Sequence, residues 1–449
     1  MKTSVLGQDF AMTPSVEEII RNTIIDDNNE DAFYVVDIQD ILRKHKKWLL
    51  NMPRVQPYYA VKCNPTPIVL ELLSALGVGF DCASKNEIDS VMNIGVTPNR
   101  IIYANPCKTK SFIRHAADVG VEVMTFDNEL ELYKVRQLHP NAKMVIRIKV
   151  DDSHAVCRLG LKFGADIDKV QHLLQTAKNI GVNVIGCSFH VGSGCESADA
   201  YTEAIANAKY VFEVGRELGF KMTFLDIGGG FPGTSITKVR FEDTAKAVSA
   251  ALDLHFPAVD AFGNESNITI IAEPGRYYVA SAFVLATNII AKRSVQMEDQ
   301  TAMMYYLNDG VYGSFNCTIF DHWVVEPTPF PIDESLEDRQ NHLTTIWGPT
   351  CDSMDCIKRD IHMPEMHIGE WIIFKEMGAY TMCAGSEFNG FKMPAHLYYV
   401  PAYTLQMLHH LPNWSRIAAI LDIADNEDMS DSAMDVFDAD HSLELISVH

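Results

Sequence analysis

The stretch Pro57-Tyr58-Tyr59-Ala60-Val61-Lys62-Cys63-Asn64 decides how the chain is interpreted. It is a β-prone run that ends on a lysine, and an apolar helical pattern from Ile68 to Leu76 follows it directly. A strand that turns into a helix leaves its last side chain above the edge of the sheet. Burial lowers the pKa of an amine toward the range in which it attacks a carbonyl, so Lys62 is a candidate for covalent bond formation with an aldehyde. The alternative is a surface lysine in a loop.

The composition indicates a globular protein with two domains, because 449 residues with 47% hydrophobic and 21% charged side chains can build two cores. The ten cysteines show no metal-binding spacing, and the N-terminus is not apolar. We therefore expect reduced thiols, a cytoplasmic location, no bound metal and no membrane span. The net charge of −22 disfavours a nucleic-acid partner and suits a small cationic substrate.

A regular alternation of strand and helix patterns follows a strand at residues 32–37 and a helix at 38–50. Eight β-prone runs alternate with helical patterns, at residues 57–62, 79–84, 101–106, 121–127, 144–150, 182–191, 224–230 and 268–276. This rhythm predicts a (β/α)8 barrel of the TIM type over residues 32–278. A doubly wound sheet is the competing interpretation, and it would usually use fewer strands.

The rhythm stops after residue 278. Strand-like runs separated by Pro- and Gly-containing turns predict an all-β domain over residues 279–412, interrupted by a weakly ordered stretch at 327–341. Residues 1–31 are predicted to be a lead-in that packs on this β-domain. Residues 413–449 are predicted to be a disordered acidic tail, since nine Asp and Glu residues and no Lys or Arg follow residue 420.

Polar residues and glycines collect at the carboxyl ends of the predicted barrel strands, where such barrels carry their active sites. They are Lys62, Asp81, Arg147, His190, Gly228, Gly229, Gly230, Glu273, Gly275 and Arg276. An amine, a carboxylate and a glycine loop that can hold one phosphate together indicate pyridoxal 5′-phosphate. Glu273 would keep the pyridine nitrogen protonated, and His190 could lie against the ring.

The glycine loop also fits the dinucleotide pattern G-x-G-x-x-G from Gly228 to Gly233. That interpretation needs a helix that opens from the motif within an N-terminal βαβ unit. Here Pro232 and a non-helical stretch follow the seventh strand, so nicotinamide binding is disfavoured.

Five motifs strongly resemble the eukaryotic ornithine decarboxylase family: residues 59–64, 189–194, 226–233, 273–278 and 347–352. The resemblance covers about residues 31–403. It implies a group IV, pyridoxal-phosphate-dependent decarboxylase with an alanine-racemase-like barrel and a β-domain. It also implies a head-to-tail homodimer with two shared active sites that converts L-ornithine to putrescine and CO2, the first step of polyamine biosynthesis.

The resemblance also implies a role for individual residues. Lys62 matches the lysine that holds the cofactor, Glu273 its partner at the pyridine nitrogen and His190 the residue stacked on the ring, while Asp81 and Arg147 lie beside the cofactor. The phosphate site would consist of Ser193, Gly230, Gly275, Arg276 and Tyr380. Cys351 matches a catalytic thiol supplied by the second subunit, Asp321 and Asp352 face the distal amine of the substrate, and Tyr312 and Phe388 line the same pocket. Lys162 and Gly378 match positions linked to the dimer contact.

Two other functions stay open. Cys383, Gly385 and Glu387 replace the small residues expected between Tyr380 and Phe388, which could favour another basic amino acid such as lysine or arginine. The resemblance extends to antizyme-inhibitor proteins, which share the fold without catalysis and typically lose cofactor or catalytic positions. Residues 109–133 align with the segment that binds antizyme in animal enzymes, so antizyme is a candidate partner.

Overall fold

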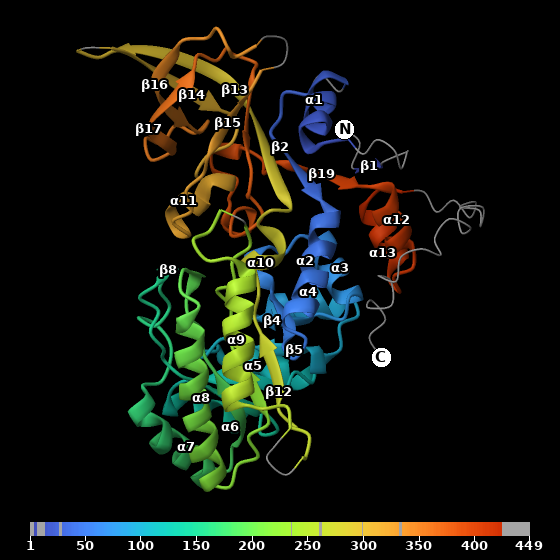
Figure 1. Ribbon diagram of the computed structural model, residues 1–449, viewed down its shortest axis with the longest axis vertical. Helices are drawn as coiled ribbons and strands as arrows, with labels where there is room; N and C mark the ends of the chain where they lie inside the picture. The colour runs from blue at the N-terminus through green and yellow to red at the C-terminus, as the bar shows by residue number, and fades with distance from the viewer. Residues whose placement is uncertain are drawn as a thin grey trace.

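The structure is a computed structural model that describes residues 4–6, 14–26, 29–234, 236–259, 263–298, 300–331 and 335–423. It places a parallel barrel at one end of the molecule and a β-sheet domain at the other (Figure 1). None of the helices within these ranges is long and apolar enough to cross a membrane.

The barrel is closed by eight parallel strands, which confirms the predicted (β/α)8 fold. In order around the barrel they are β11 (Phe224–Asp226), β12 (Thr269–Ala272), β3 (Gln56–Ala60), β4 (Gly79–Cys82), β5 (Ile101–Tyr103), β6 (Val123–Phe126), β7 (Lys143–Arg147) and β9 (Asn183–Ser188). All eight end earlier than predicted, because the residues after the last ladder pair already belong to the loops of the candidate site. Lys62, for example, lies in the short 3-10 helix η1 (Val61–Cys63) just after β3.

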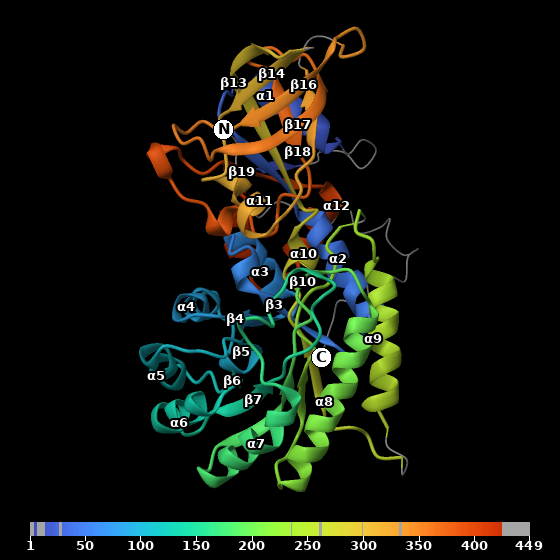
Figure 2. The same ribbon diagram turned by 90° about the vertical axis from the view of Figure 1, so that its left-hand side faces the viewer.

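Helices cover the outside of the barrel, as the two views show (Figures 1 and 2). They are α3 (Pro67–Ala75), α4 (Lys85–Asn93), α5 (Lys110–Asp118), α6 (Glu129–Leu138), α7 (Val170–Asn179), α8 (Asp199–Glu217) and α9 (Phe241–His255). Local capping starts two of them, because the Ser84 side chain accepts from Glu87 N and the Asn128 side chain from Glu131 N. The cluster of Tyr58, Ile102, Val145, Phe224 and Ile271 takes one residue from each of five strands, which is typical of a layer of inward-pointing side chains.

In the described part of the chain the second domain is a nine-stranded mixed sheet. Its main path runs through β1 (Ser4–Leu6), β19 (Ala395–Val400), β2 (Phe33–Asp37), β13 (Phe283–Gln296), β14 (Thr301–Leu307), β16 (Asn341–Trp347) and β17 (Cys356–Pro364). Two further strands branch from β13, since β18 (Trp371–Phe374) pairs with it and β15 (Pro327–Phe330) pairs with β18.

Strand β2 corrects the predicted domain division, because it was assigned to the barrel and belongs to the sheet. It pairs antiparallel with β13 and parallel with β19, both of which lie far from it in the sequence. Helix α1 (Val16–Asp26) packs on the same sheet through Ile19, Ile20 and Ile24. The chain therefore starts in the sheet domain and enters the barrel through α2 (Ile38–Asn51).

Two other predictions of weak order were wrong. Strand β15 lies inside the stretch 327–341, where its two prolines are tolerated on a strand that pairs on one side with β18. Helix α12 (Ala402–His409) ends before residue 412, but α13 (Trp414–Ile420) lies inside the predicted tail. Helix α13 is anchored to the barrel because Arg416 Nε binds Glu71 Oε1 of α3 at 2.7 Å. Residues 424–449 of the predicted tail lie outside the described residues.

Candidate active site

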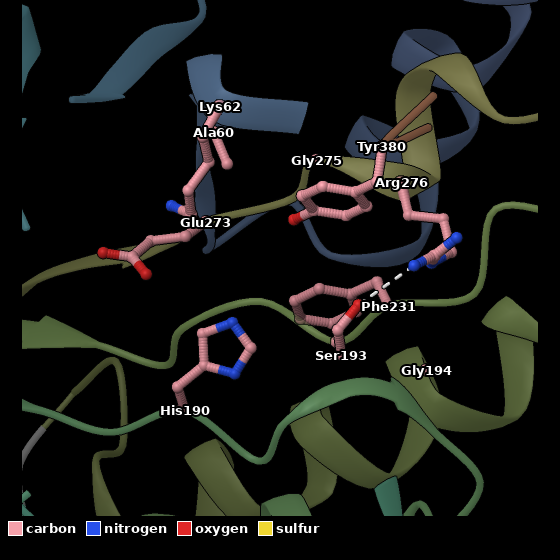
Figure 3. A pocket seen from close by; sticks show the side chains of 11 residues that line it. Ala60, Lys62, His190, Ser193, Gly194, Phe231, Glu273, Gly275, Arg276 and Tyr380 are labelled. Atoms are coloured by element: carbon pink, nitrogen blue, oxygen red, sulfur yellow. Dashed lines mark hydrogen bonds between the residues drawn. The ribbon is translucent and has the colours of Figure 1, made fainter. Parts of the chain in front are cut away.

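A cleft opens where the carboxyl ends of the barrel strands meet the sheet domain, with about 330 Å³ of empty space. Figure 3 shows Lys62 and Glu273 on one side of it, Arg276 and Ser193 on the other, and His190 below. The lining residues are Ala60, Lys62, His190, Ser193, Gly194, Gly230, Phe231, Glu273, Gly275, Arg276 and Tyr380. Eight predicted cofactor residues are thus brought together.

Lys62 binds a buried carboxylate. Its Nζ donates to Asp81 Oδ2, and the Asp81 side chain is fully buried. Burial is the largest influence and lowers the pKa of Lys62, but the neighbouring groups Asp81, Tyr380 and Glu273, with Asp81 first, together outweigh it, and the pKa is raised. The expectation of a lowered lysine pKa is therefore wrong, because the strand-end lysine has an acid as its neighbour.

Glu273 is paired with a second acid that sequence reasoning did not single out. It is 8% exposed, and its side chain is hydrogen-bonded to that of Asp226 at the end of β11. Burial, followed by the charge of Asp226, raises the pKa of Glu273 well above its ordinary value, and burial raises the pKa of Asp226 to about 7. The pair therefore holds a proton near neutral pH. The motif that contains Asp226 was noticed, but only the fold shows which strand lies beside Glu273.

His190 is held in its neutral form. Its Nδ1 accepts from Gly192 N at 3.0 Å, so a proton on the ring belongs on Nε2. Burial, followed by the charges of Arg147 and Lys62, lowers the pKa of His190 well below its ordinary value. A neutral imidazole suits the predicted role of a flat surface beneath an aromatic ring.

The far side of the cleft holds an arginine that already has two partners. Arg276 Nη2 donates to Ser193 Oγ at 3.1 Å and to both carboxylate oxygens of Asp321 at 2.7 Å. Asp321 was predicted to face the distal amine of the substrate, and here its carboxylate is bound to the guanidinium instead. The reason is proximity: Asp321 directly follows α11 (Cys317–Phe320), and its buried carboxylate lies against the Arg276 guanidinium, which is a strong hydrogen-bond donor for it.

The glycines of the loop pack so closely against their neighbours that a side chain would not fit. Gly230 has φ +98°, and a Cβ there would lie 2.5 Å from Gly192 O. A Cβ on Gly229 would lie 2.9 Å from His190 Nε2. Gly228 and Gly229 pack against His190, and the Arg147 guanidinium carbon lies 5.4 Å from the centre of the Phe163 ring. These three residues support the cleft and do not line it.

The donor set of the cleft fits pyridoxal phosphate. One end carries the Lys62 amine and the Glu273 carboxyl, which match the aldehyde and the pyridine nitrogen of the cofactor. The other end carries the Arg276 guanidinium and the Ser193 hydroxyl, which match its phosphate. Two buried polar atoms at these ends, Asp81 Oδ1 and Arg276 Nε, have no hydrogen-bond partner among the described residues. Such atoms are expected where a ligand completes the network.

A second cluster of predicted residues lies in the sheet domain, and none of its members lines the cleft. The Tyr312 hydroxyl donates to Asp352 Oδ2, and the rings of Tyr312 and Phe388 stack with centroids 4.4 Å apart. The hydrogen bond with Tyr312 lowers the pKa of Asp352, which is therefore ionised. Cys351 is exposed, and its backbone N–H donates to Asn389 Oδ1 at 3.2 Å.

A buried acid holds this second cluster together. Asp355 is 1% exposed, and its Oδ1 accepts from Val311 N at 2.8 Å, beside Tyr312. Its Oδ2 accepts from Thr350 N at 2.9 Å and from Thr350 Oγ1 at 2.6 Å, beside Cys351. One carboxylate thus joins the loop that carries Tyr312 to the loop that carries Cys351 and Asp352.

The two predicted dimer positions differ from each other. Lys162 is exposed, and its Nζ lies 5.1 Å from the centre of the Phe163 ring. Gly378 is buried within the chain, where its carbonyl accepts from Asn64 Nδ2 at 2.8 Å and a Cβ would overlap Val279 O at 1.8 Å. Gly378 thus permits close packing between the two domains, and its link to the dimer contact stays a prediction.

Comparison with known proteins finds similar sequences among ornithine decarboxylases and among antizyme inhibitors. Residues 38–280 match the family model described as the pyridoxal binding domain of pyridoxal-dependent decarboxylases. The chain is 48% identical to ornithine decarboxylase of Rattus norvegicus over 90% of its own length and 88% of the relative. It is 51% identical to antizyme inhibitor 2 of Xenopus laevis, over 88% and 86%. A solved arginine decarboxylase of Paramecium bursaria Chlorella virus superposes with a TM-score of 0.79 at 38% identity, over 86% of this chain and all of the other.

Proposed function

Because the chain belongs to the pyridoxal-dependent decarboxylase family that includes the ornithine decarboxylases, we propose that it decarboxylates L-ornithine to putrescine with pyridoxal phosphate as cofactor. The observation that carries this proposal is the cleft in which Lys62, Glu273 and Arg276 face one another. All the positions implied for catalysis are present in the sequence.

The residues of the cleft divide the work of holding the cofactor. Lys62 Nζ offers the amine for covalent attachment, Arg276 and Ser193 bind the phosphate, and the Glu273 carboxyl holds a proton at the ring nitrogen. When bound, pyridoxal phosphate supplies an aromatic ring that accepts the electron pair left behind as a substrate carboxylate departs as CO2. Asp226 shares the proton of Glu273, which keeps that carboxyl in its acid form near neutral pH.

The remaining steps need groups that one chain does not bring to the cleft. A proton must be delivered to the α-carbon of the product, and the Cys351 thiol is the donor that we assign. Cys351 and Asp352 lie in the second cluster, outside the cleft lining. We therefore infer a homodimer with two-fold symmetry, in which each subunit inserts its second cluster into the cleft of the other.

Charge supports a substrate with a distal amine. Asp352 is ionised, and the hydroxyl of Tyr312 orients it without neutralising it. The Asp321 carboxylate is paired with the Arg276 guanidinium. It would have to interact with both this guanidinium and the distal amine of the substrate. A carboxylate left unpaired in a closed site penalises a neutral amino acid. The 48% identity to an ornithine decarboxylase favours ornithine among the basic amino acids.

The proposal is tested by CO2 release from carboxyl-labelled ornithine, lysine and arginine with added pyridoxal phosphate. We expect release from ornithine, and none from either the Lys62→Ala or the Cys351→Ala variant. If the sites are shared, a 1:1 mixture of the two inactive variants recovers about a quarter of the wild-type rate, since half of the dimers are mixed and each has one intact site. A preference for lysine or arginine would implicate the exposed loop of Glu387, and no recovery would refute the shared site.

The second candidate function is regulation through antizyme, which the 51% identity to an antizyme inhibitor 2 favours. The segment 109–133 contains α5, β6 and the start of α6, with Leu130 79% exposed on the surface. No CO2 release from any substrate by a protein that binds the cofactor would support this function, and antizyme binding would then be measured directly.

A further inference from the structure

A lysine outside the cleft binds the last residue of the glycine loop. Lys44 lies on α2, and its Nζ donates to the carbonyl oxygen of Gly233. The Ser281 hydroxyl approaches the same oxygen at 3.4 Å. Gly230 and Phe231 of this loop line the cleft, so the loop is held from behind by the helix that joins the two domains.

The same lysine is also fixed to the segment that carries Arg276. The hydroxyl of Tyr277 donates to the Lys44 carbonyl at 2.8 Å, and Lys44 Nζ lies 5.3 Å from the centre of the Tyr277 ring. Gly233 itself touches this segment, because a Cβ on Gly233 would lie 2.3 Å from Arg276 O. Lys44 therefore contacts both backbone segments that form the phosphate end of the cleft.

The surroundings of Lys44 show that its charge is held at a cost. Burial lowers the pKa of Lys44, the charges of Lys47 and Arg43 lower it further, and the carboxylates of Asp40 and Glu376 oppose these effects. Asp40 accepts from Ser281 Oγ at 2.6 Å, and the Glu376 carboxylate acts on Lys44 from the sheet domain.

We propose that Lys44 is a positioning residue for the phosphate end of the cleft: it fixes Gly233 and the Arg276 segment in the arrangement that receives a phosphate monoester. The inference rests on the proposed binding of pyridoxal phosphate. Lys44 does not touch the ligand and acts through the two segments it joins. Its contribution therefore appears in the affinity for ligands that carry the phosphate and is absent for ligands that lack it.

The test compares pyridoxal phosphate with pyridoxal, which keeps the aldehyde and the ring nitrogen but has no phosphate. Dissociation constants are measured by calorimetry on the full-length, cofactor-free chain. We expect Lys44→Met to weaken pyridoxal phosphate binding about tenfold, as for loss of a charged hydrogen bond that orders a site, and to leave pyridoxal binding unchanged. Lys44→Arg should restore most of the affinity.

Lys47→Met is the matched control. Lys47 lies on the same helix, pairs with Glu242 at 2.6 Å and approaches the ring of Phe241, but it does not contact the glycine loop. Its variant should bind both ligands like the wild type. Equal weakening of both ligands in Lys44→Met, or no weakening, overturns the inference, while binding of pyridoxal phosphate by the wild type still upholds the proposed cofactor. A wild-type chain that binds neither ligand refutes the proposed function and the inference with it.

Discussion

Replacing Asp355 with asparagine tests whether one buried acid holds the second cluster together. The carboxylate accepts three hydrogen bonds, from Val311 N and from the backbone N–H and hydroxyl of Thr350. It fits only because two glycines flank it, since a Cβ on Gly310 would lie 2.2 Å and one on Gly348 2.1 Å from Asp355 Oδ1. Asparagine has the same shape, so the change removes charge and one acceptor without opening a cavity.

The expected loss follows from the donors that asparagine cannot satisfy. Its amide oxygen can face either Val311 or Thr350, and its amide nitrogen then faces the other backbone N–H. One buried N–H left without an acceptor costs about 1–3 kcal/mol, and loss of the charge on the remaining bonds adds about 1 kcal/mol. We therefore expect the free energy of unfolding to fall by about 2–4 kcal/mol. The loops of Tyr312 and Cys351 lose their common anchor.

Urea denaturation measures this loss, and Asp360→Asn is the control because Asp360 is exposed on β17 of the same domain. The control should change the unfolding free energy by less than about 0.5 kcal/mol. CO2 release should fall in Asp355→Asn, while pyridoxal phosphate still binds with wild-type affinity, since the cleft does not contain Asp355. An unfolding free energy equal to that of the control would refute the assigned anchor, and weakened cofactor binding would refute the separation of the two clusters.

Three further predictions address other parts of the chain. Glu71→Gln should lower the unfolding free energy by about 1–3 kcal/mol in urea denaturation, because Arg416 loses a charged acceptor; an unchanged value would contradict the anchoring of α13. Burial lowers the pKa of His45 to about 4, so the folded state favours its neutral form, and about 3 kcal/mol of unfolding free energy is lost as the pH falls from 6.5 through 4. His45→Gln should lack this part of the pH dependence of stability. A pH profile identical to that of the wild type would refute the prediction. Asp81→Asn removes the charge that raises the pKa of Lys62, so adduct formation with pyridoxal phosphate, followed by absorbance, should proceed at lower pH than in the wild type; an unshifted rate profile would count against the pair.

The barrel and its site positions could be predicted because both depend on local patterns. Strand and helix periods alternate along the chain, and the carboxyl end of each strand is visible in the sequence. Strand β2 could not be placed this way, since its partners β13 and β19 lie far away in the chain and its own pattern fits either domain. The pairs Glu273–Asp226 and Arg276–Asp321 were missed for the same reason: each residue carries a signal alone, but only the fold shows its neighbour.

The fold separates the two halves of the proposed site energetically as well as in space. In the cleft, Lys62 is neutralised by Asp81 and Arg276 by Asp321, so the pocket is formed before any ligand binds. The second cluster depends on Asp355, which contacts neither of these pairs. A member of this family could therefore lose catalysis through changes in the second cluster and still fold and bind the cofactor. This chain keeps both networks, and for that reason CO2 release by the wild type and its loss in Cys351→Ala, rather than cofactor binding, distinguish an enzyme from a regulator.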